Sequence, residues 1–265
     1  MAMAIGGRQL STELTTFQIL FFRSAVGLLV VAFLLQRAGW SNIKTKAFGT
    51  HLVRNCAHFG GQYGWFYGIA LIPLSEVFAI EFTVPIWTAI FATLILHERM
   101  NRLRMLAIAL GFIGVLVILR PGASAISPAA LAVLGSAICY AISHVLTKRL
   151  SAHDSVLAIL FYMTAMQLPL GLLPALPKWV WPSAALWPWV FIVAVTSLSA
   201  HYCMARAFRL ADATVVVPMD FLRLPLIAVV GFFFYHEPLN GWVFAGALIV
   251  LAGTWLNLKS AAVKS

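Results

Sequence analysis

The segment SEVFAIEFTVPIWTAIFATLILHE, Ser75–Glu98, contains an apolar run that is long enough to cross a lipid bilayer. It nevertheless carries an acidic residue, Glu81, and, one turn later, Pro85. Proline has no amide hydrogen, so the carbonyl of Glu81 is expected to lack its helical hydrogen bond. Broken hydrogen bonding at membrane depth is tolerated mainly next to a cavity or a protein partner. The segment therefore predicts a kinked transmembrane helix that carries a functional acid.

The same pattern recurs in the second half of the chain, at a constant offset of 139 in the numbering. At this offset Glu81 aligns with Asp220, and the pair His97-Glu98 aligns with His236-Glu237. We therefore expect two copies of one unit, at residues 1–122 and 123–265, each with an acid in the corresponding helix. Further matches at the same offset are Phe82 with Phe221, Ser75 with Thr214, Ala89 with Ala228, and Gly114 with Gly253.

The composition is that of an integral membrane protein. Of the 265 residues, 62% are hydrophobic and only 10% are charged, whereas soluble domains are typically about a quarter charged. The mean hydropathy is +0.94. The net charge of +10 does not indicate a nucleic-acid partner, because the basic residues lie in short loops between apolar runs. In such loops they set the orientation of helices in a bilayer.

The sequence lacks motifs for metal, nucleotide or catalytic chemistry. Its three cysteines are isolated in apolar runs, so they indicate neither a disulfide framework nor a metal site. His97-Glu98 does not begin an HExxH zinc motif, because position 101 is Asn, and there is no GxxxxGK[ST] phosphate loop. We therefore expect no metal, no cofactor and no enzymatic activity.

Nine apolar segments are predicted to span the membrane, so the expected fold class is all-α. Prolines and glycines separate them, and the short connectors make neighbouring helices antiparallel. The second unit has five of these helices and the first has four. We therefore interpret Met1–Gly7 as the end of a largely missing first helix, because the sequence starts late or the protein is a truncated form. The nine segments are Phe17–Gln36, His51–Leu71, Ser75–Leu96, Leu103–Leu119, Pro128–Lys148, Ser155–Leu176, Leu186–Arg206, Thr214–Tyr235 and Gly241–Leu258.

The distribution of Lys and Arg predicts the orientation of these helices. If the end of Phe17–Gln36 is cytoplasmic, the opposite side holds only Arg8, Arg120 and Lys178. Five helices is an odd number, so the two units are expected to lie upside-down relative to each other. Such an inverted five-plus-five repeat is typical of secondary transporters. The cytoplasmic helix ends then hold Arg37, Lys44, Lys46, Arg99, Arg102, Arg104, Lys148, Arg149, Arg206, Arg209, Lys259 and Lys264.

The predicted helix His51–Leu71 has two distinct faces. Arg54, His58 and Gln62 are spaced by four residues and share a polar face. Ionisable side chains in the membrane interior cost at least about 2.5–3.5 kcal/mol each, so they are functional candidates. For Arg54 a second interpretation stays open, in which it snorkels to the cytoplasmic surface. About half a turn away, small residues permit tight packing against another helix; they are Gly60, Gly64 and Gly68.

The two acids have interpretations that are not exclusive. Glu81 lines a cavity, or it forms a salt bridge that only holds helices together, with Arg23 as the candidate partner. Asp220 can pair with Arg223, three residues later, in a helix that prolines make irregular. In the inverted arrangement the two acids lie in opposite halves of the bilayer.

The repeat also bears on the interpretation of His201 and of the His97-Glu98 pair. His201 aligns with Gln62 at the offset of 139, which extends the repeat to another helix pair. His97 and Glu98, by contrast, are interpreted only as the interfacial end of an apolar helix.

Several short motifs resemble the EamA type of the drug/metabolite transporter superfamily. They are the FFRS at Phe21–Ser24, the LHER at Leu96–Arg99, the glycines of Gly111–Gly114, and Arg120–Gly122. The resemblance covers essentially the whole chain. It implies a ten-helix carrier with a central cavity made by the first four helices of each unit, and a homodimer to which the fifth helices contribute.

A narrower resemblance concerns the solute. Arg23, the Arg54…His58 stripe and the Glu81–Pro85 motif are similar to those of subgroups that take up S-adenosylmethionine or riboflavin. An amino acid derivative is a further candidate solute.

We therefore expect a multi-pass secondary transporter of a bacterial inner membrane, with the solute and the lipid bilayer as partners. It moves a small polar or amphoteric metabolite by alternating access, with Glu81 and Asp220 exchanging cations or protons. Two alternatives stay open, namely a membrane-embedded enzyme acting on lipid and a non-transporting assembly subunit. The candidate substrate-binding residues are Arg23, Arg54, His58, Gln62, Trp65, Glu81, Phe82, Trp87, His201, Asp220 and Arg223.

Overall fold

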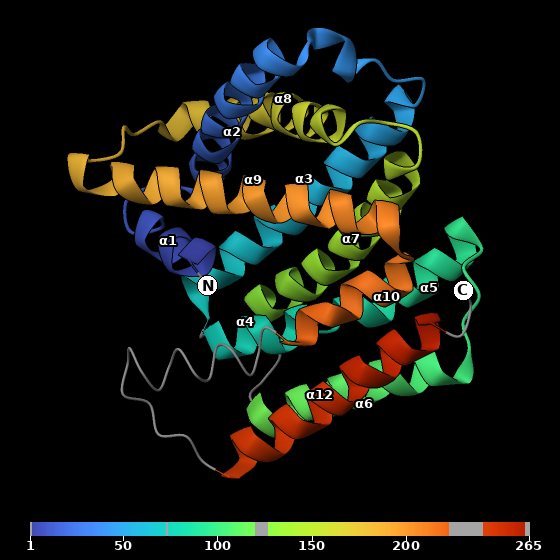
Figure 1. Cartoon of the computed structure of the whole chain (residues 1–265). Coiled ribbons are helices and arrows are strands. Elements are labelled where there is room, and N and C mark those ends of the chain that lie inside the picture. The colour runs from blue at the N-terminus through green and yellow to red at the C-terminus, as the bar shows by residue number, and fades with distance from the viewer. Residues whose placement is uncertain (1, 73, 120–126, 223–240, 263–265) are drawn as a thin grey trace.

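The computed structural model describes residues 2–72, 74–119, 127–222 and 241–262 (Figure 1). Every regular element in these ranges is a helix, which confirms the all-α prediction. Four stretches of the described chain are long and apolar enough to cross a membrane, namely Thr16–Ala38, Pro128–Ser151, Val156–Lys178 and Ala184–Leu210.

The helices of the first half are α1 (Ala2–Leu10), α2 (Thr16–Ala38), α3 (Phe48–Leu71), α4 (Leu74–Glu81), α5 (Val84–Leu96) and α6 (Arg102–Leu119). Those described in the second half are α7 (Pro128–Ser151), α8 (Val156–Ala175), α9 (Trp187–Leu210), α10 (Ala213–Val216) and α12 (Gly241–Ala262). Short 3₁₀ turns are η1 (Trp40–Ile43), η2 (Leu176–Lys178), η3 (Ala184–Leu186) and η4 (Val217–Leu222).

Side-chain caps fix the starts of three long helices. At α2, Thr15 accepts a hydrogen bond from the Gln18 amide, and the Gln18 side chain accepts one from the Thr15 amide. Ser127 and Ser155 accept from amides in the first turns of α7 and α8. These caps satisfy amides that would otherwise lack partners, so each helix begins at a defined residue.

The helix predicted over Ser75–Leu96 is broken, as Pro85 indicated. Helix α4 ends at Glu81 and α5 starts at Val84, with Pro85 in its first turn. Helix α5 then ends at His97, whose left-handed φ of 56° closes the helix. The corresponding second segment is also irregular, because α10 gives way to the 3₁₀ turn η4 around Pro218. The predicted continuation to Tyr235, with Arg223, Pro225 and His236-Glu237, lies outside the described residues.

Helix α3 packs closely on α7 through its glycine face. A methyl group on Gly64 would lie 2.5 Å from the carbonyl oxygen of Ala132, and one on Gly68 would collide with Val133. Gly61 faces Tyr140 in the same way. The predicted small-residue face is therefore confirmed for Gly64 and Gly68, whereas Gly60 is exposed and Gly61 takes its place in the contact.

Three other helix pairs complete the bundle. Helix α2 lies along α8, α1 lies on α9, and α6 pairs with α12 at the opposite end of the molecule (Figure 1). The bounds of the helices follow the offset of the sequence repeat. Both ends of α3 and α9 are related by the offset of 139, as are the starts of α6 and α12.

The tight α3–α7 contact predicts the effect of one added methyl group. Gly64→Ala should lower the free energy of unfolding by about 1–3 kcal/mol, because a helix backbone must move to make room. The measurement is thermal or denaturant unfolding of the purified protein in detergent. Gly49→Ala is the matched control in the same helix, since no atom lies within 4 Å of its added methyl group. Equal stability of the two variants would contradict this packing.

Candidate functional site

A buried polar cluster lies between α2, α3, α8 and α9. We call it the central cluster; its members are Arg23 from α2, His58 and Gln62 from α3, Gln167 from α8, and Ser197 and His201 from α9. All are buried except His201, which is half-buried. Both halves of the chain therefore contribute side chains to one site.

Arg23 is the cation at the centre of this cluster. Its guanidinium donates to Ser197 Oγ at 2.8 Å, to Gln62 Oε1 at 2.8 Å and to Gln167 Oε1 at 2.6 Å. A guanidinium can only donate, so the two glutamine oxygens must face it. Their amide NH₂ groups are therefore turned toward the neighbouring imidazole of His58.

The glutamine orientation fixes the tautomer of His58. Gln167 Nε2 lies 2.8 Å from His58 Nδ1, which must accept this hydrogen bond because an amide NH₂ only donates. The proton of neutral His58 is then on Nε2. Gln62 Nε2 is the more distant neighbour of this nitrogen, at 3.3 Å.

The tautomer of His201 follows from that of His58. His58 Nε2 and His201 Nε2 are 2.8 Å apart, so the His58 N–H donates and the His201 nitrogen accepts. His201 Nδ1 carries the other proton and donates to the Ser197 carbonyl at 2.7 Å. Both rings are neutral in this arrangement, and Arg23 provides the only formal charge of the central cluster.

Arg54 is buried one turn of α3 away from His58, with an exposed fraction of 2%. Its Nε donates to Thr147 Oγ1 at 3.0 Å and its Nη1 donates to Asn55 Oδ1 at 2.7 Å. The interpretation that Arg54 snorkels to the cytoplasmic surface is therefore wrong. Polar acceptors on α7 and α3 hold its guanidinium inside the bundle.

Glu81 is half-buried at the break between α4 and α5. Its carboxylate accepts a hydrogen bond of 2.7 Å from Trp65 Nε1. The Arg23–Glu81 salt bridge considered above is wrong, because Arg23 donates to Ser197, Gln62 and Gln167 instead. Within the described residues, the ion pairs are His51–Asp154 and Arg104–Asp212.

The remaining predicted site residues lie apart from the central cluster. Trp65 and Phe82 are buried in the apolar core, where the Phe82 ring lies 5.9 Å from that of Phe221. Trp87 is half-buried against a separate apolar cluster on α5, α7 and α9, and its Nε1 has no hydrogen-bond partner. Arg223 is not among the described residues.

The expectation that Asp220 is buried is wrong, because its side chain is exposed. It lies in the 3₁₀ turn η4, where each residue turns the chain by about 120° rather than 100°. In this geometry the neighbouring Phe221 occupies the inward position, packed against Gly111.

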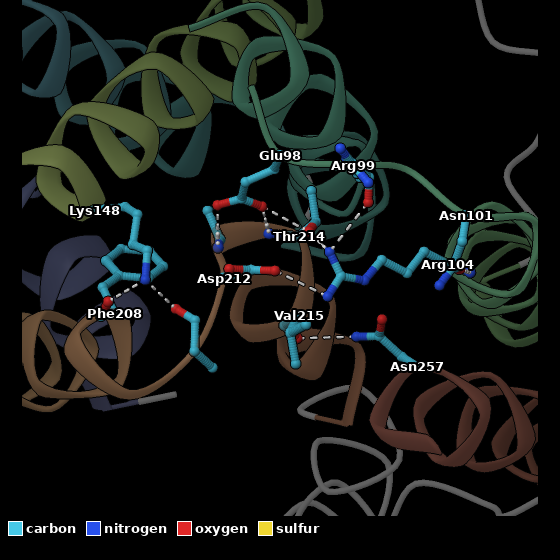
Figure 2. Close-up of polar contacts among 12 residues, drawn as sticks. Glu98, Arg99, Asn101, Arg104, Lys148, Phe208, Asp212, Thr214, Val215 and Asn257 are labelled. Atoms are coloured by element: carbon cyan, nitrogen blue, oxygen red, sulfur yellow. Dashed lines mark hydrogen bonds and ion pairs between the residues drawn. The ribbon is translucent and has the colours of Figure 1, made fainter. Parts of the chain in front are cut away.

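A second polar group, which we call the clamp, joins α5 and α6 to the start of α10 (Figure 2). The Glu98 carboxylate accepts from the Ala213 amide at 2.9 Å, the Thr214 amide at 3.1 Å and the Thr214 hydroxyl at 2.7 Å. Arg104 donates to the same hydroxyl at 2.8 Å and to Asp212 Oδ2 at 3.0 Å. Glu98 is thus more than the helix end that its sequence position suggested.

Lys148 makes further polar contacts on the face of the molecule where the clamp lies. Lys148 donates to the carbonyls of Phe208 and Ala211, each at 2.7 Å, at the end of α9 (Figure 2). A cation at this position satisfies orphan carbonyls and suits the helix dipole. Nearby, Asp154 accepts from Thr45 and contacts His51, each at 2.7 Å. All these contacts lie on the face that the Lys and Arg distribution predicts to be cytoplasmic.

Some site residues were not selected from the sequence. Ser197 aligns with His58 at the offset of 139, so the repeat could have found it. Thr147 and Asn55, the partners of Arg54, carry no such signal. In the described ranges no group of three metal-ligating side chains comes together.

Comparisons with known proteins agree with one another. The sequence model of the EamA-like transporter family matches residues 2–120 and 127–259. The chain is 27% identical to an S-adenosylmethionine uptake transporter of Rickettsia prowazekii, over 96% of this chain and 86% of that protein. It is 30% identical to a riboflavin transporter of Vibrio cholerae (86% and 77%) and 28% identical to a pseudopaline exporter of Pseudomonas aeruginosa (92% and 86%).

A solved crystal structure shares the fold. Its TM-score is 0.80 at 15% identity, and the match covers 100% of this chain and 96% of that chain. At this identity the likeness concerns the fold alone.

The clamp predicts a stability effect for Glu98. Glu98→Ala should lower the free energy of unfolding by about 1–3 kcal/mol, because three donors at the start of α10 lose a charged acceptor. Unfolding in detergent measures the change. The control is His97→Asn, since asparagine tolerates a left-handed backbone. A Glu98→Ala variant as stable as the control would show that the clamp does not hold this face together.

Proposed function

The chain belongs to the EamA-like transporter family, and on that premise we propose that it carries a small amphoteric metabolite across a bacterial inner membrane by alternating access. The observation that carries the proposal is the central cluster, a buried hydrogen-bonded network to which four helices contribute. Polar and ionisable groups inside a membrane bundle are costly and mark solute pathways. The proposed solute-binding residues are Arg23, Arg54, His58, Gln62 and His201.

The proposed architecture is an inverted repeat with units at residues 1–122 and 123–265. The shared offset of the α3 and α9 bounds supports it. His58 and Gln62 align with Ser197 and His201, and these four residues meet in the central cluster. Transporters of this type place the solute site where the two repeats meet.

The clamp is the proposed cytoplasmic gate. It links the end of α5 and the start of α6, in the first unit, to α10 in the second (Figure 2). On the opposite side, Arg8 donates to the carbonyls of Ile69, at 2.9 and 3.1 Å, and of Ile72, at 2.8 Å. These Arg8 contacts join α1 to the end of α3 within the first unit, whereas the clamp joins the two units, so alternating access requires the clamp contacts to break when the cytoplasmic side opens.

The proposed solutes are S-adenosylmethionine, riboflavin or an amino acid derivative, because the named relatives include an S-adenosylmethionine uptake transporter and a riboflavin transporter. Glu81 is the acid proposed for coupling to a cation or proton. The alternative of an enzyme acting on lipid depended on the His-Glu pairs. His97 closes a helix and Glu98 is engaged by three donors, so this pair is unsuited to catalysis.

Transport itself is the first test. Proteoliposomes that contain the full chain should accumulate radiolabelled S-adenosylmethionine or riboflavin, and His201→Gln should slow this uptake by about tenfold, equivalent to roughly 1.4 kcal/mol. The control is His153→Gln, at an exposed histidine between α7 and α8. Absence of uptake of all three proposed solute classes would refute the carrier function.

The gate has its own test. In a chain whose native cysteines are replaced by serine, Glu98→Cys and Thr214→Cys can be joined by a short, reducible bis-methanethiosulfonate reagent. The cross-link should reduce uptake by about tenfold or more, and a reductant should restore it, because the two units can no longer separate on this side. Full transport by the cross-linked protein would exclude the clamp as a gate.

A further inference from the structure

Two arginines are buried in the bundle with neutral partners. Arg23 is 4% exposed and Arg54 is 2% exposed. Their hydrogen bonds go to hydroxyl oxygens of Ser197 and Thr147 and to side-chain amide oxygens of glutamine and asparagine. These acceptors satisfy N–H groups, but they do not compensate two positive charges.

The described acidic side chains that form hydrogen bonds have their partners elsewhere. Asp154 is held by Thr45 and His51, Glu81 accepts from Trp65, and Glu98 and Asp212 belong to the clamp. Glu13 accepts from Ser183 at the opposite face. In the described chain, therefore, no acidic side chain hydrogen-bonds either buried arginine.

An uncompensated ion inside a protein costs several kcal/mol, and a membrane interior offers little water to reduce that cost. The like charges of Arg23 and Arg54 also repel each other, and both interact electrostatically with the His58 ring. The imidazoles of His58 and His201 cannot supply a negative charge, because a histidine is either neutral or positive. Among the described side chains, therefore, none supplies a negative charge to these two arginines.

Buried polar atoms without a hydrogen-bond partner belong to Arg23 itself and to residues next to the partner of Arg54. Arg23 Nε is buried and has no hydrogen-bond partner. On α7, His144 Nδ1 and Ser143 Oγ, next to the Arg54 partner Thr147, are also buried without partners. The unpartnered Nε–H of the Arg23 guanidinium can donate a charge-assisted hydrogen bond to a carboxylate.

We propose that Arg23 and Arg54 form an anion subsite of the carrier, and that the transported solute must bring a carboxylate to it. This inference rests on the function proposed above and narrows its solute class. S-adenosylmethionine carries an amino acid carboxylate, whereas riboflavin has no ionised group at neutral pH. The subsite therefore selects solutes of the amino acid type and disfavours the uncharged flavin.

Binding to the purified full chain in detergent tests the subsite without transport. The probes are S-adenosylmethionine and decarboxylated S-adenosylmethionine, which differ by the carboxylate. The wild-type protein should bind the first about tenfold or more tightly than the second. Arg23→Gln and Arg54→Gln should each bring the ratio of the two affinities to about one, whatever the change in the affinity for each probe alone. Arg37→Gln, at an exposed arginine on α2, is the matched control and should keep the difference.

Each other outcome opposes the subsite. Equal affinity for the two probes in the wild-type protein overturns it, as does a preference that survives both arginine substitutions. Failure of both S-adenosylmethionine and free methionine to bind overturns it too. Uptake of riboflavin by proteoliposomes in any of these cases would leave the carrier function standing, so the two failures are distinguishable.

Discussion

The guanidinium of Arg23 sets the direction of the hydrogen bonds that run from Gln167 to His58 and from His58 to His201. It can only donate, so it turns the oxygens of Gln62 and Gln167 toward itself and their NH₂ groups toward His58. The orientation of Gln167 determines that the proton of His58 is on Nε2. His58 therefore donates to His201, and His201 in turn donates to the Ser197 carbonyl. One fixed donor thus orders side chains from four helices. Loss of the Arg23 charge would release the orientation of the whole network.

Helix α3 can contribute side chains to this network because the face that packs on α7 consists of glycines. Gly61, Gly64 and Gly68 bring α7 into close contact, which gives the helix a rigid support without long apolar side chains. The polar stripe from Arg54 to Gln62, about a quarter turn away around the helix, lies buried and contacts α2, α7, α8 and α9. The two faces are linked energetically. The van der Waals contacts of the glycine face with α7 offset the cost of desolvating the polar stripe.

Local sequence rules predicted what depends on local geometry. Pro85 predicted the break after Glu81, and the spacing of the glycines predicted the packing face of α3, because both follow from backbone chemistry within one helix. The expectation that Asp220 is buried came from its alignment with Glu81, and it was wrong because Asp220 lies in a 3₁₀ turn whereas Glu81 ends an α-helix. The role of Glu98 was missed because its partner, Thr214, is 116 residues away and no local pattern reveals such a contact.

The separation of the central cluster from the clamp suits a carrier in which binding and gating are distinct. A solute can shift a conformational equilibrium only by the difference between its affinities for the two states. No described acidic side chain pairs with Arg23 or Arg54, so an anion that reaches them removes an electrostatic cost and makes this difference large. The clamp is built from paired charges and capped amides, and it has no comparable need of the solute. In the proposed carrier the solute therefore acts on the balance between states at the cluster, while the clamp sets how firmly the cytoplasmic side is closed.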